Sequence, residues 1–465
     1  MYIKGALRKE RAVRRQTGWA IVAVFLLIAG VFSQEPERAA EDELVVKARA
    51  MLEALQRGDF PTAARDFDET MLKVSGPDKL EEFWKQVPDK IGVLKRQTAA
   101  RRDQLAGYEV AYVTCEFEKV TLDARVVFDQ HNKITGFQFV PSLPPAKYEP
   151  PGYADASQFE ETDVSVGDGE WELPGTLAMP KGEKPFPAVV LVHGSGPNDR
   201  DETIGPNKPF RDIAWGLATR GIAVLRYDKR TLIYGTKLVA DPKLAAGLTV
   251  KEETIEDALA AVRLLQKTPG IDRKKIFVLG HSLGGMLVPR IALAGQDLGI
   301  SGFIIMAGLT QPLAETYLRQ MTYLLGLDGE TLADDKKQLE EIKAQVARIN
   351  GLQEADAGSA ERIINASPAY WLGLRGYYPP AVALQVEKPM LILQGSRDYQ
   401  VTTEDFENWE KALEGRAGVE FKLYPKLNHL FFEGQGIPTP NEYTLQHGSV
   451  AEYVIADIAA FILKH

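Results

Sequence analysis

Hydrophobic and polar positions follow two different periods in the first part of the chain. Apolar residues before Gly58 recur every three or four positions, on one face of a predicted helix; they are Leu44, Ala48, Met51, Leu52 and Leu55. A second amphipathic segment covers residues 80–87, and strand-like runs follow at 108–118, 122–129 and 134–140. The polar loop 130–133 predicts a hairpin between the last two runs. Helices followed by antiparallel strands predict a small α+β domain over residues 41–141.

From residue 158 onward, short apolar runs alternate with segments of helical spacing. The predicted strands cover residues 159–166, 172–179, 188–193, 222–227, 276–279, 303–306, 390–394 and 421–424. Helical spacing is clearest over residues 210–220 and 252–266. Strands alternating with helices are typical of a mostly parallel sheet that is covered on both faces. We therefore expect an α/β fold over residues 158–465.

Two segments interrupt these patterns. Residues 141–151 include five prolines, and we expect residues 142–157 to form an interdomain linker. Residues 310–386 contain a charged helical stretch and a cluster of aromatic residues, Tyr370, Trp371, Tyr377 and Tyr378. Because this second segment falls between two predicted strands, we expect it to form a cap inserted over the sheet.

Composition narrows the classes of protein to consider. With 45% hydrophobic and 26% charged residues, the chain can bury a large core in more than one domain. The formal net charge of −9 argues against a nucleic-acid partner. Cys115 is the one cysteine, so no disulfide can form within the chain, and we expect it to be buried in a strand. No Cys and His residues have metal-ligand spacing, and neither a metal nor an organic cofactor is expected.

The N-terminus has a distinct pattern of charge and hydropathy. Six basic residues precede an apolar run from Trp19 to Phe32, as in a secretory signal. The run is short for a membrane-spanning helix, which needs about 20 apolar residues. Residues 1–34 are therefore predicted to be a cleaved signal peptide or an uncleaved anchor that tethers the chain through residues 19–32. Both alternatives predict an exported protein, and the polar residues 35–43 are predicted to be a linker.

The motif Gly280-His281-Ser282-Leu283-Gly284 is the strongest chemical signal in the sequence. It follows a predicted strand and precedes a predicted helix over residues 285–293. In that context it predicts a tight turn that holds Ser282 in a strained conformation, with its hydroxyl exposed above the sheet. Ser282 is accordingly the candidate nucleophile, since a side chain in place of either glycine would collide with the neighbouring strand and helix.

A serine nucleophile needs a histidine as base and a carboxylate to orient it. After a turn of this kind the order along the chain is serine, acid, histidine. His429 follows the last predicted strand in a loop, whereas His447 is predicted at the start of the final helix and His465 is the terminal residue. Asp398 follows the strand at 390–394 and is the candidate acid. Its rivals Glu404 and Asp405 are predicted to begin the next helix.

The negative charge of a tetrahedral intermediate requires backbone N–H donors. Leu283 directly follows the nucleophile and is the first candidate. The second should come from the loop 193–196, where we favour Ser195 and leave Gly194 and Gly196 open. We expect His281 to be structural and His193 to brace this loop rather than move protons.

A charged run lies beside the predicted mouth of the site. It comprises Asp199, Arg200, Asp201 and Glu202. Most runs of this kind are solvated, so we expect these side chains to face water, with a direct contact to substrate as the alternative.

These motifs together resemble the serine α/β-hydrolases. The strings at 193–202, 223–230 and 393–401 resemble bacterial EstD-type carboxylesterases, which carry a small extra domain before the hydrolase domain. The resemblance is good over residues 155–465. The N-terminal part is similar to a domain of unknown function with a cone-shaped, nuclear-transport-factor-like fold. The family implies hydrolysis of short-chain carboxylic esters.

We therefore interpret the chain as an exported carboxylesterase that acts on a small-molecule ester. A first alternative is an aminopeptidase, thioesterase or acyltransferase activity on the same triad. A second is a binding module in which the N-terminal domain is functional and the hydrolase domain is a scaffold. The natural substrate, the role of the N-terminal domain and the oligomeric state stay open.

Overall fold

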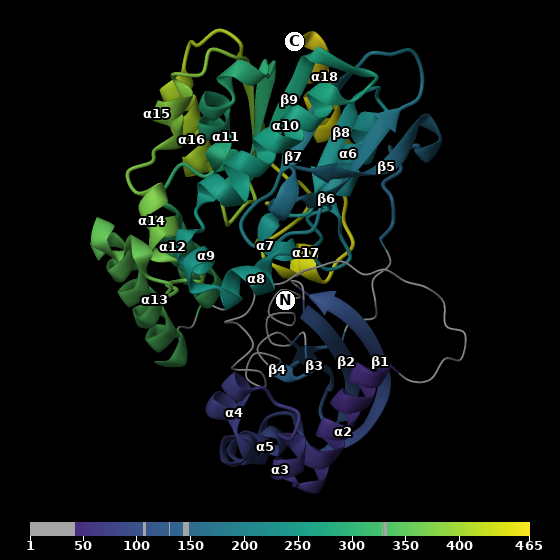
Figure 1. Cartoon of the computed structure of the whole chain (residues 1–465), viewed down its shortest axis with the longest axis vertical. Helices are drawn as coiled ribbons and strands as arrows, with labels where there is room; N and C mark the ends of the chain where they lie inside the picture. The colour runs from purple at the N-terminus through teal and green to yellow at the C-terminus, as the bar shows by residue number, and fades with distance from the viewer. Residues whose placement is uncertain (1–41, 106–107, 130, 143–147, 328, 330–332) are drawn as a thin grey trace. The chain divides into compact units, whose positions relative to one another are not determined.

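The computed structural model describes residues 42–465, except 106–107, 130, 143–147, 328 and 330–332 (Figure 1). The chain divides into two compact units between Ala146 and Lys147. Residues 1–34, the predicted signal or anchor, lie outside the described residues. Within the described part of the chain, no helix combines the length and the apolar character needed to cross a membrane. The single cysteine, Cys115, is free and buried.

The first unit consists of helices followed by an antiparallel sheet, as predicted. Its helices are α2 (Glu43–Arg57), α3 (Phe60–Ala63), α4 (Glu69–Ser75) and α5 (Pro77–Ile91). Its strands are β1 (Leu94–Leu105), β2 (Tyr108–Phe117), β3 (Thr121–Phe128) and β4 (Ile134–Pro141), paired in that order. The core forms where the apolar face of α2 meets one face of the sheet, in a cluster that includes Leu52, Leu55 and Phe128.

Three elements of this unit were not predicted: α3, α4 and β1. The strand β1 is rich in Arg, Lys and Gln, because it lies at the edge of the sheet and turns many side chains to solvent. Irregular pairing near Arg96 and Gln97 also breaks its alternation. The predicted linker 35–43 ends earlier than expected, since Glu43 already begins α2 and the Asp42 carboxylate caps it by accepting from the Leu44 N–H at 2.9 Å.

The second unit is built on an eight-stranded sheet with the order β12-β11-β10-β9-β7-β8-β6-β5. The strands are β5 (Phe159–Val166), β6 (Leu173–Pro180), β7 (Phe186–Val192), β8 (Ala223–Tyr227), β9 (Ile271–His281), β10 (Gly302–Met306), β11 (Met390–Gly395) and β12 (Val419–Tyr424). All neighbours from β8 to β12 pair in parallel, whereas β5 and β6 pair antiparallel at one edge. The predicted mostly parallel α/β sheet is confirmed.

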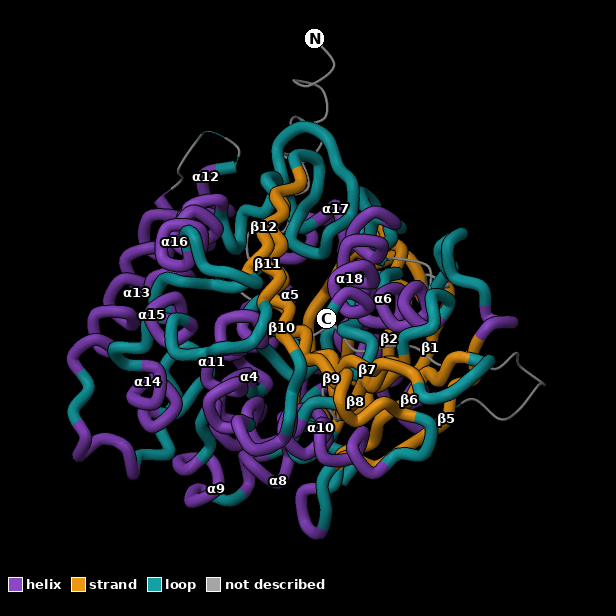
Figure 2. Tube along the Cα trace, turned by 90° about the horizontal axis from the view of Figure 1, so that it is seen from above, coloured by secondary structure: helices purple, strands orange, loops and turns teal. Residues whose placement is uncertain are grey.

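Helices cover both faces of this sheet (Figure 2). On one face α6 (Pro209–Ala218) packs against α18 (Glu452–Lys464). On the other lie α10 (Asp257–Lys267), α11 (Leu283–Ala294) and α16 (Thr403–Leu413). The central strands are almost wholly buried, as a sheet covered on both faces requires. A π-helical turn, Lys251–Glu256, precedes α10. Three short helices were not predicted: α7 (Arg230–Ile233), α8 (Gly235–Ala240) and α9 (Pro242–Gly247).

The segment between β10 and β11 forms a helical cap. It contains α12 (Leu313–Gly326), α13 (Ala333–Gly351), α14 (Pro368–Leu374) and α15 (Pro379–Ala383). Two hydrogen bonds attach it to α11: the Tyr377 hydroxyl donates to the Met286 carbonyl, and Arg290 donates to the Gly373 carbonyl, each at 2.7 Å. The predicted insertion is thus a set of helices held against the helix that follows Ser282.

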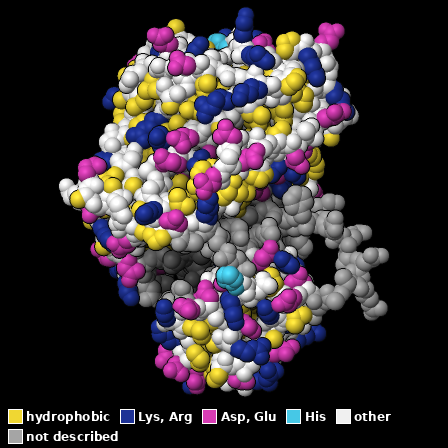
Figure 3. Space-filling model, in the orientation of Figure 1, with side chains coloured by type: hydrophobic (Ala, Val, Ile, Leu, Met, Phe, Trp, Pro, Cys, Tyr) yellow, Lys and Arg dark blue, Asp and Glu magenta, His cyan; other side chains and the backbone are white. Residues whose placement is uncertain are grey.

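The described residues 148–157 of the predicted linker pack on the rest of the second unit. The Tyr148 hydroxyl donates to Asp212 at 2.7 Å, and the Tyr153 hydroxyl donates to the Val450 carbonyl at 2.6 Å. On the face drawn in Figure 3, basic and acidic side chains of the described residues are interspersed with apolar ones. The acidic side chains of the described residues are therefore not gathered into one patch on that face.

Candidate active site

Ser282 occupies the turn between β9 and α11, and its backbone is strained. Its φ is 54° and its ψ is −116°, a region that non-glycine residues rarely adopt and that costs about 1–3 kcal/mol. The turn is held because the Ser282 N–H donates to the Met306 carbonyl at 2.9 Å. A Cβ on Gly280 or Gly284 would overlap backbone atoms of the neighbouring segments, so both positions require glycine. The predicted strand–turn–helix context of the motif is confirmed.

Asp398 and His429 are brought together from the loops after β11 and β12. The His429 Nδ1 lies 2.6 Å from Asp398 Oδ2, and both side chains are buried. The other oxygen, Asp398 Oδ1, accepts from the N–H groups of Gln400 and Val401 at 2.8 and 3.0 Å. Because an ionised carboxylate can only accept hydrogen bonds, the proton of the neutral imidazole is assigned to Nδ1. The lone pair on Nε2 is then available to accept a proton.

The ring of His429 lies beside that of His281, the residue before Ser282, with 4.7 Å between their centroids. Among the described residues, the Ser282 hydroxyl and the His429 Nε2 have no hydrogen-bond partner. Contacts of this kind often tighten only when substrate binds. The loop that carries His429 therefore lies against the turn that carries Ser282.

The loop after β7 approaches Ser282 closely at Gly194. A Cβ on Gly194 would lie 3.1 Å from the Ser282 Cβ and 3.2 Å from Glu202 Oε1, so a side chain there would require these neighbours to shift by a few tenths of an ångström. The Gly194 N–H donates to Glu202 Oε1 at 2.6 Å and is therefore already used. Within the described part of the chain, the N–H groups of Ser195 and Leu283 have no hydrogen-bond partner. Of the two alternatives to Ser195, Gly194 is therefore committed, whereas the Gly196 N–H, like that of Ser195, donates to no other group in the described part of the chain.

A second histidine–carboxylate pair lies beside the pair of His429 and Asp398. The His281 Nδ1 is 2.8 Å from Glu202 Oε2, and its Nε2 is 3.0 Å from the His429 carbonyl oxygen. Burial disfavours the charged imidazole, but the Glu202 carboxylate and its hydrogen bond outweigh it and raise the pKa of His281. Burial likewise acts against the charged carboxylate, yet His281 lowers the pKa of Glu202. Both shifts favour an ion pair in which His281 donates from both nitrogens.

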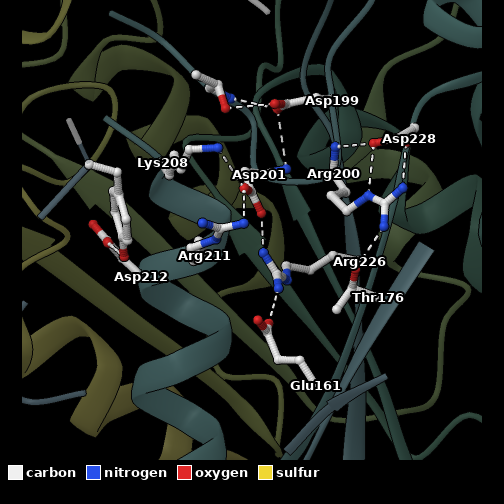
Figure 4. A network of polar contacts seen from close by, with 12 residues as sticks. Glu161, Thr176, Asp199, Arg200, Asp201, Lys208, Arg211, Asp212, Arg226 and Asp228 are labelled. Carbon is white, nitrogen blue, oxygen red and sulfur yellow. Dashed lines mark hydrogen bonds and ion pairs between the residues drawn. The ribbon is translucent and has the colours of Figure 1, made fainter. Parts of the chain in front are cut away.

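The expectation that the run from Asp199 to Glu202 is solvated is wrong for its last two residues, whereas Asp199 and Arg200 are partly exposed. Asp201 and Glu202 are buried, with 2% and 7% of their surface exposed. Figure 4 shows Asp201 between Lys208, Arg211 and Arg226, and the first two approach it to 2.9 Å. Burial would raise the pKa of Asp201, but Arg226 and these two cations lower it to about 2. Asp201 is buried because oppositely charged groups outside the run surround it, and Glu202 is buried because it pairs with His281. The residues of the run do not reveal these partners.

Other predicted residues have structural surroundings. His193 stacks on Phe210 at 5.2 Å, and burial lowers its pKa to about 4, so its ring is neutral. Asp405 caps α16 together with Thr402, as expected. His447 is not at the start of the final helix, because α18 begins only at Glu452; its Nε2 accepts from the Glu149 N–H at 3.3 Å.

Sequence reasoning missed two side chains that contact Gly194. Glu202 was placed in a solvated run, and Lys229, whose Nζ donates to the Gly194 carbonyl at 2.8 Å, was given no role. The available signal was indirect, since both belong to the charged strings 193–202 and 223–230. Within the described residues, no group of three or more His, Cys, Asp or Glu side chains is arranged to hold a metal ion.

Residues 189–438 match the alpha/beta hydrolase family, and residues 48–137 match a family described as a protein of unknown function, DUF3887. The chain is 39% identical over 385 residues to Esterase EstD of Thermotoga maritima, with 83% of this chain and 87% of the relative covered. It is 24% identical over 351 residues to dipeptidyl peptidase family member 6 of Caenorhabditis elegans, of which it covers 38%.

Two solved esterases are similar at lower identity. The esterase Pf2001 of Pyrococcus furiosus has 18% identity and a TM-score of 0.41, over 66% of this chain and 91% of that one. Est1E of Butyrivibrio proteoclasticus has 18% identity and the same TM-score of 0.41, over 65% and 98%. The family match spans more than half of the chain and includes the turn at Ser282 and the Asp398–His429 pair. The chain therefore belongs to the alpha/beta hydrolase family and is a relative of the bacterial EstD esterase, with a DUF3887 domain before the hydrolase domain.

Proposed function

We propose that the protein is a serine carboxylesterase that hydrolyses short-chain carboxylic esters through an acyl-enzyme. The observation that carries this proposal is the pair of His429 and Asp398, whose imidazole keeps Nε2 uncommitted next to the strained turn of Ser282. The 39% identity to a relative named as an esterase supports an ester as the substrate.

In the first half-reaction, the Ser282 oxygen forms a bond to the ester carbonyl carbon while its proton passes to His429 Nε2. Asp398 holds the imidazole in the required tautomer and stabilises its charged form. The N–H groups of Leu283 and Ser195 donate to the oxyanion of the tetrahedral intermediate. When the intermediate collapses, the bond to the alcohol oxygen breaks and His429 returns the proton to the leaving alkoxide.

In the second half-reaction, water replaces the alcohol. His429 takes a proton from water as its oxygen attacks the acyl carbon, and the proton then returns to Ser282 as the acid leaves. The reaction balances with the ester and one water molecule.

The test compares turnover of p-nitrophenyl acetate by the wild-type chain and by Ser282→Ala. Ser165→Ala is a matched control, since Ser165 is exposed on the edge strand β5. We expect turnover to fall by at least about 10³-fold in Ser282→Ala and to stay unchanged in the control. A fluorophosphonate probe should label Ser282 alone, as measured by mass spectrometry of the labelled peptide. Unchanged turnover in Ser282→Ala rules the mechanism out.

A substrate panel separates the esterase from other activities on the same triad. Esters, thioesters and aminoacyl p-nitroanilides with the same acyl group are compared by kcat/KM. We expect short acyl esters to be preferred over the anilides. A preference for aminoacyl anilides would instead indicate an aminopeptidase.

We further propose that residues 1–34 direct the protein out of the cytoplasm. The basic segment followed by the apolar run 19–32 supports this proposal. Fractionation of bacteria that express the full chain or a chain without residues 1–34 tests it, and N-terminal mass spectrometry of the exported form distinguishes cleavage from anchoring. Equal cytoplasmic retention of both chains would contradict export.

A further inference from the structure

Lys229 is a buried cation that contacts the backbone next to Ser282. It lies in the turn between β8 and α7, and only 1% of its surface is exposed. Its Nζ donates to the Gly194 carbonyl oxygen at 2.8 Å. A lysine is rarely buried to this degree unless it is paired, and Glu253 Oε1 lies 3.5 Å from Nζ. The closer partner is the carbonyl.

That carbonyl belongs to the same peptide group as the free N–H of Ser195. In a trans peptide the C=O and the N–H lie in one plane and point in opposite directions. A cation fixed on the oxygen therefore sets the direction of the N–H, and it also polarises the peptide so that the N–H is a stronger donor. Asn198 Nδ2 donates to the same carbonyl at 3.3 Å and adds a second restraint.

The cation is itself held in place by the cap. Glu253 accepts from the Thr231 hydroxyl at 2.9 Å and from the Tyr370 hydroxyl of α14 at 2.8 Å. Burial raises the pKa of Tyr370 well above its usual value, so this hydroxyl keeps its proton and stays a donor. The ion pair of Lys229 and Glu253 is thus enclosed between the eight-stranded sheet and the cap. Lys229 therefore has little freedom to turn away from Gly194.

We propose that Lys229 is a positioning residue that orients and polarises the Gly194–Ser195 peptide as an oxyanion donor. This inference rests on the proposed function, because it requires an oxyanion to form beside Ser195. If Lys229 had only a structural role, substituting it would lower the number of folded molecules but not the turnover of each folded one. A positioning role predicts a full complement of sites that each turn over more slowly, because the interaction acts on the transition state.

The experiment uses the full chain with Lys229→Met, which keeps the length of the side chain and removes its charge. Asn198→Ala removes the weaker restraint, together with a bond from Asn198 Nδ2 to the Ser195 carbonyl at 3.1 Å. Lys229→Gln, which keeps a hydrogen-bond donor without the charge, decides the question if Lys229→Met does not fold. Arg230→Met is the matched control, since Arg230 is also buried and ion-paired, but with Asp257 rather than with the Gly194 loop. The burst of p-nitrophenol at high enzyme concentration counts the active sites, and a trifluoromethyl ketone measures binding of an oxyanion analogue.

We expect kcat per titrated site to fall about 10- to 100-fold in Lys229→Met and about 3- to 10-fold in Asn198→Ala, less than the loss of a whole oxyanion donor. KM should change less than about threefold, and affinity for the trifluoromethyl ketone should fall by the same factor as kcat/KM. Arg230→Met should keep its kcat per site.

The outcomes separate this inference from the proposed function. If the folded Lys229→Met and Asn198→Ala variants keep their kcat per site, or lose it without any loss of ketone affinity, the inference is overturned while Ser282-dependent turnover still supports the esterase. If the wild-type chain shows no Ser282-dependent turnover, the esterase and the inference fail together.

Discussion

Two buried pairs of a histidine and a carboxylate lie side by side in this protein. His429 binds Asp398 through Nδ1 at 2.6 Å, and His281 binds Glu202 through Nδ1 at 2.8 Å. The two rings are 4.7 Å apart, and each histidine has 5% of its surface exposed. By residue type, distance and burial, the pairs are nearly equivalent.

They differ at the second ring nitrogen. The Nε2 of His281 is committed to the His429 carbonyl, whereas the Nε2 of His429 has no partner among the described residues. A histidine that donates from both nitrogens holds its protons, while one that donates only from Nδ1 can accept a proton at Nε2. The comparison teaches that a histidine–carboxylate pair becomes a candidate base only where the other nitrogen is left open.

The largest expected effect comes from the pair assigned to proton transfer. Asp398→Asn keeps the shape of the side chain but cannot hold the Nδ1–H tautomer of His429. We expect kcat for p-nitrophenyl acetate to fall by about 10⁴-fold, as when the carboxylate of a comparable triad is replaced by an amide. A loss below about tenfold would mean that Asp398 does not orient the base.

Glu202→Gln should mainly change stability. The substitution leaves a buried histidine without its counter-charge, and breaking a buried ion pair in this way typically costs about 3–5 kcal/mol. We expect the free energy of unfolding in urea to fall by about 3 kcal/mol, with a smaller loss of kcat per active site than in Asp398→Asn. If Glu202→Gln lowered kcat as much as Asp398→Asn and left the free energy of unfolding unchanged, the pair of His281 and Glu202 would serve catalysis rather than stability.

The ion pair of His281 and Glu202 predicts a pH dependence with a definite sign. Because the pKa of His281 is raised above its ordinary 6.5, its contribution to stability is complete below pH 6.5 and is lost as the pH rises through the folded value. Because the pKa of Glu202 is lowered below 4.5, its contribution is present above pH 4.5 and is lost as the pH falls through the folded value. The stability difference between wild type and Glu202→Gln should therefore be largest between pH 4.5 and pH 6.5.

Urea unfolding of both chains from pH 5 to pH 9 measures this difference. We expect it to shrink above neutral pH, by at most about 1.4 kcal/mol per pH unit for one proton. A difference that grows with pH would show that His281 is neutral in the folded protein.

The smallest effect is expected at His447, the other loop histidine that follows Ser282 in the sequence. Its Nε2 accepts one N–H, from Glu149 at 3.3 Å, and no carboxylate is among its described hydrogen-bond partners. His447→Ala should change kcat less than about twofold, whereas His429→Ala should abolish turnover. Comparable losses in the two variants would remove the distinction on which the assignment of the base rests.

Much of the fold could be predicted because its local patterns are strong. The buried parallel strands are continuous apolar runs, and the face of α2 repeats at helical spacing up to Gly58. The edge strand β1 was missed because its exposed side chains are charged, and the short helices α7 to α9 were missed because they carry too little periodicity. Where burial depends on a distant partner, as at Asp201 and Glu202, composition alone predicts the wrong environment.

The sequence by itself determined the turn at Ser282, the order of Ser282, Asp398 and His429 along the chain, and the loops that carry them. These follow from local constraints: glycine where a Cβ cannot fit, and polar residues directly after apolar strands. Only the tertiary structure decided which nitrogen of each histidine is free, that Glu202 is buried against His281, and that Lys229 contacts Gly194. Those properties are set by side chains far apart in sequence that meet in a medium of low dielectric, where charge pairing decides both position and protonation.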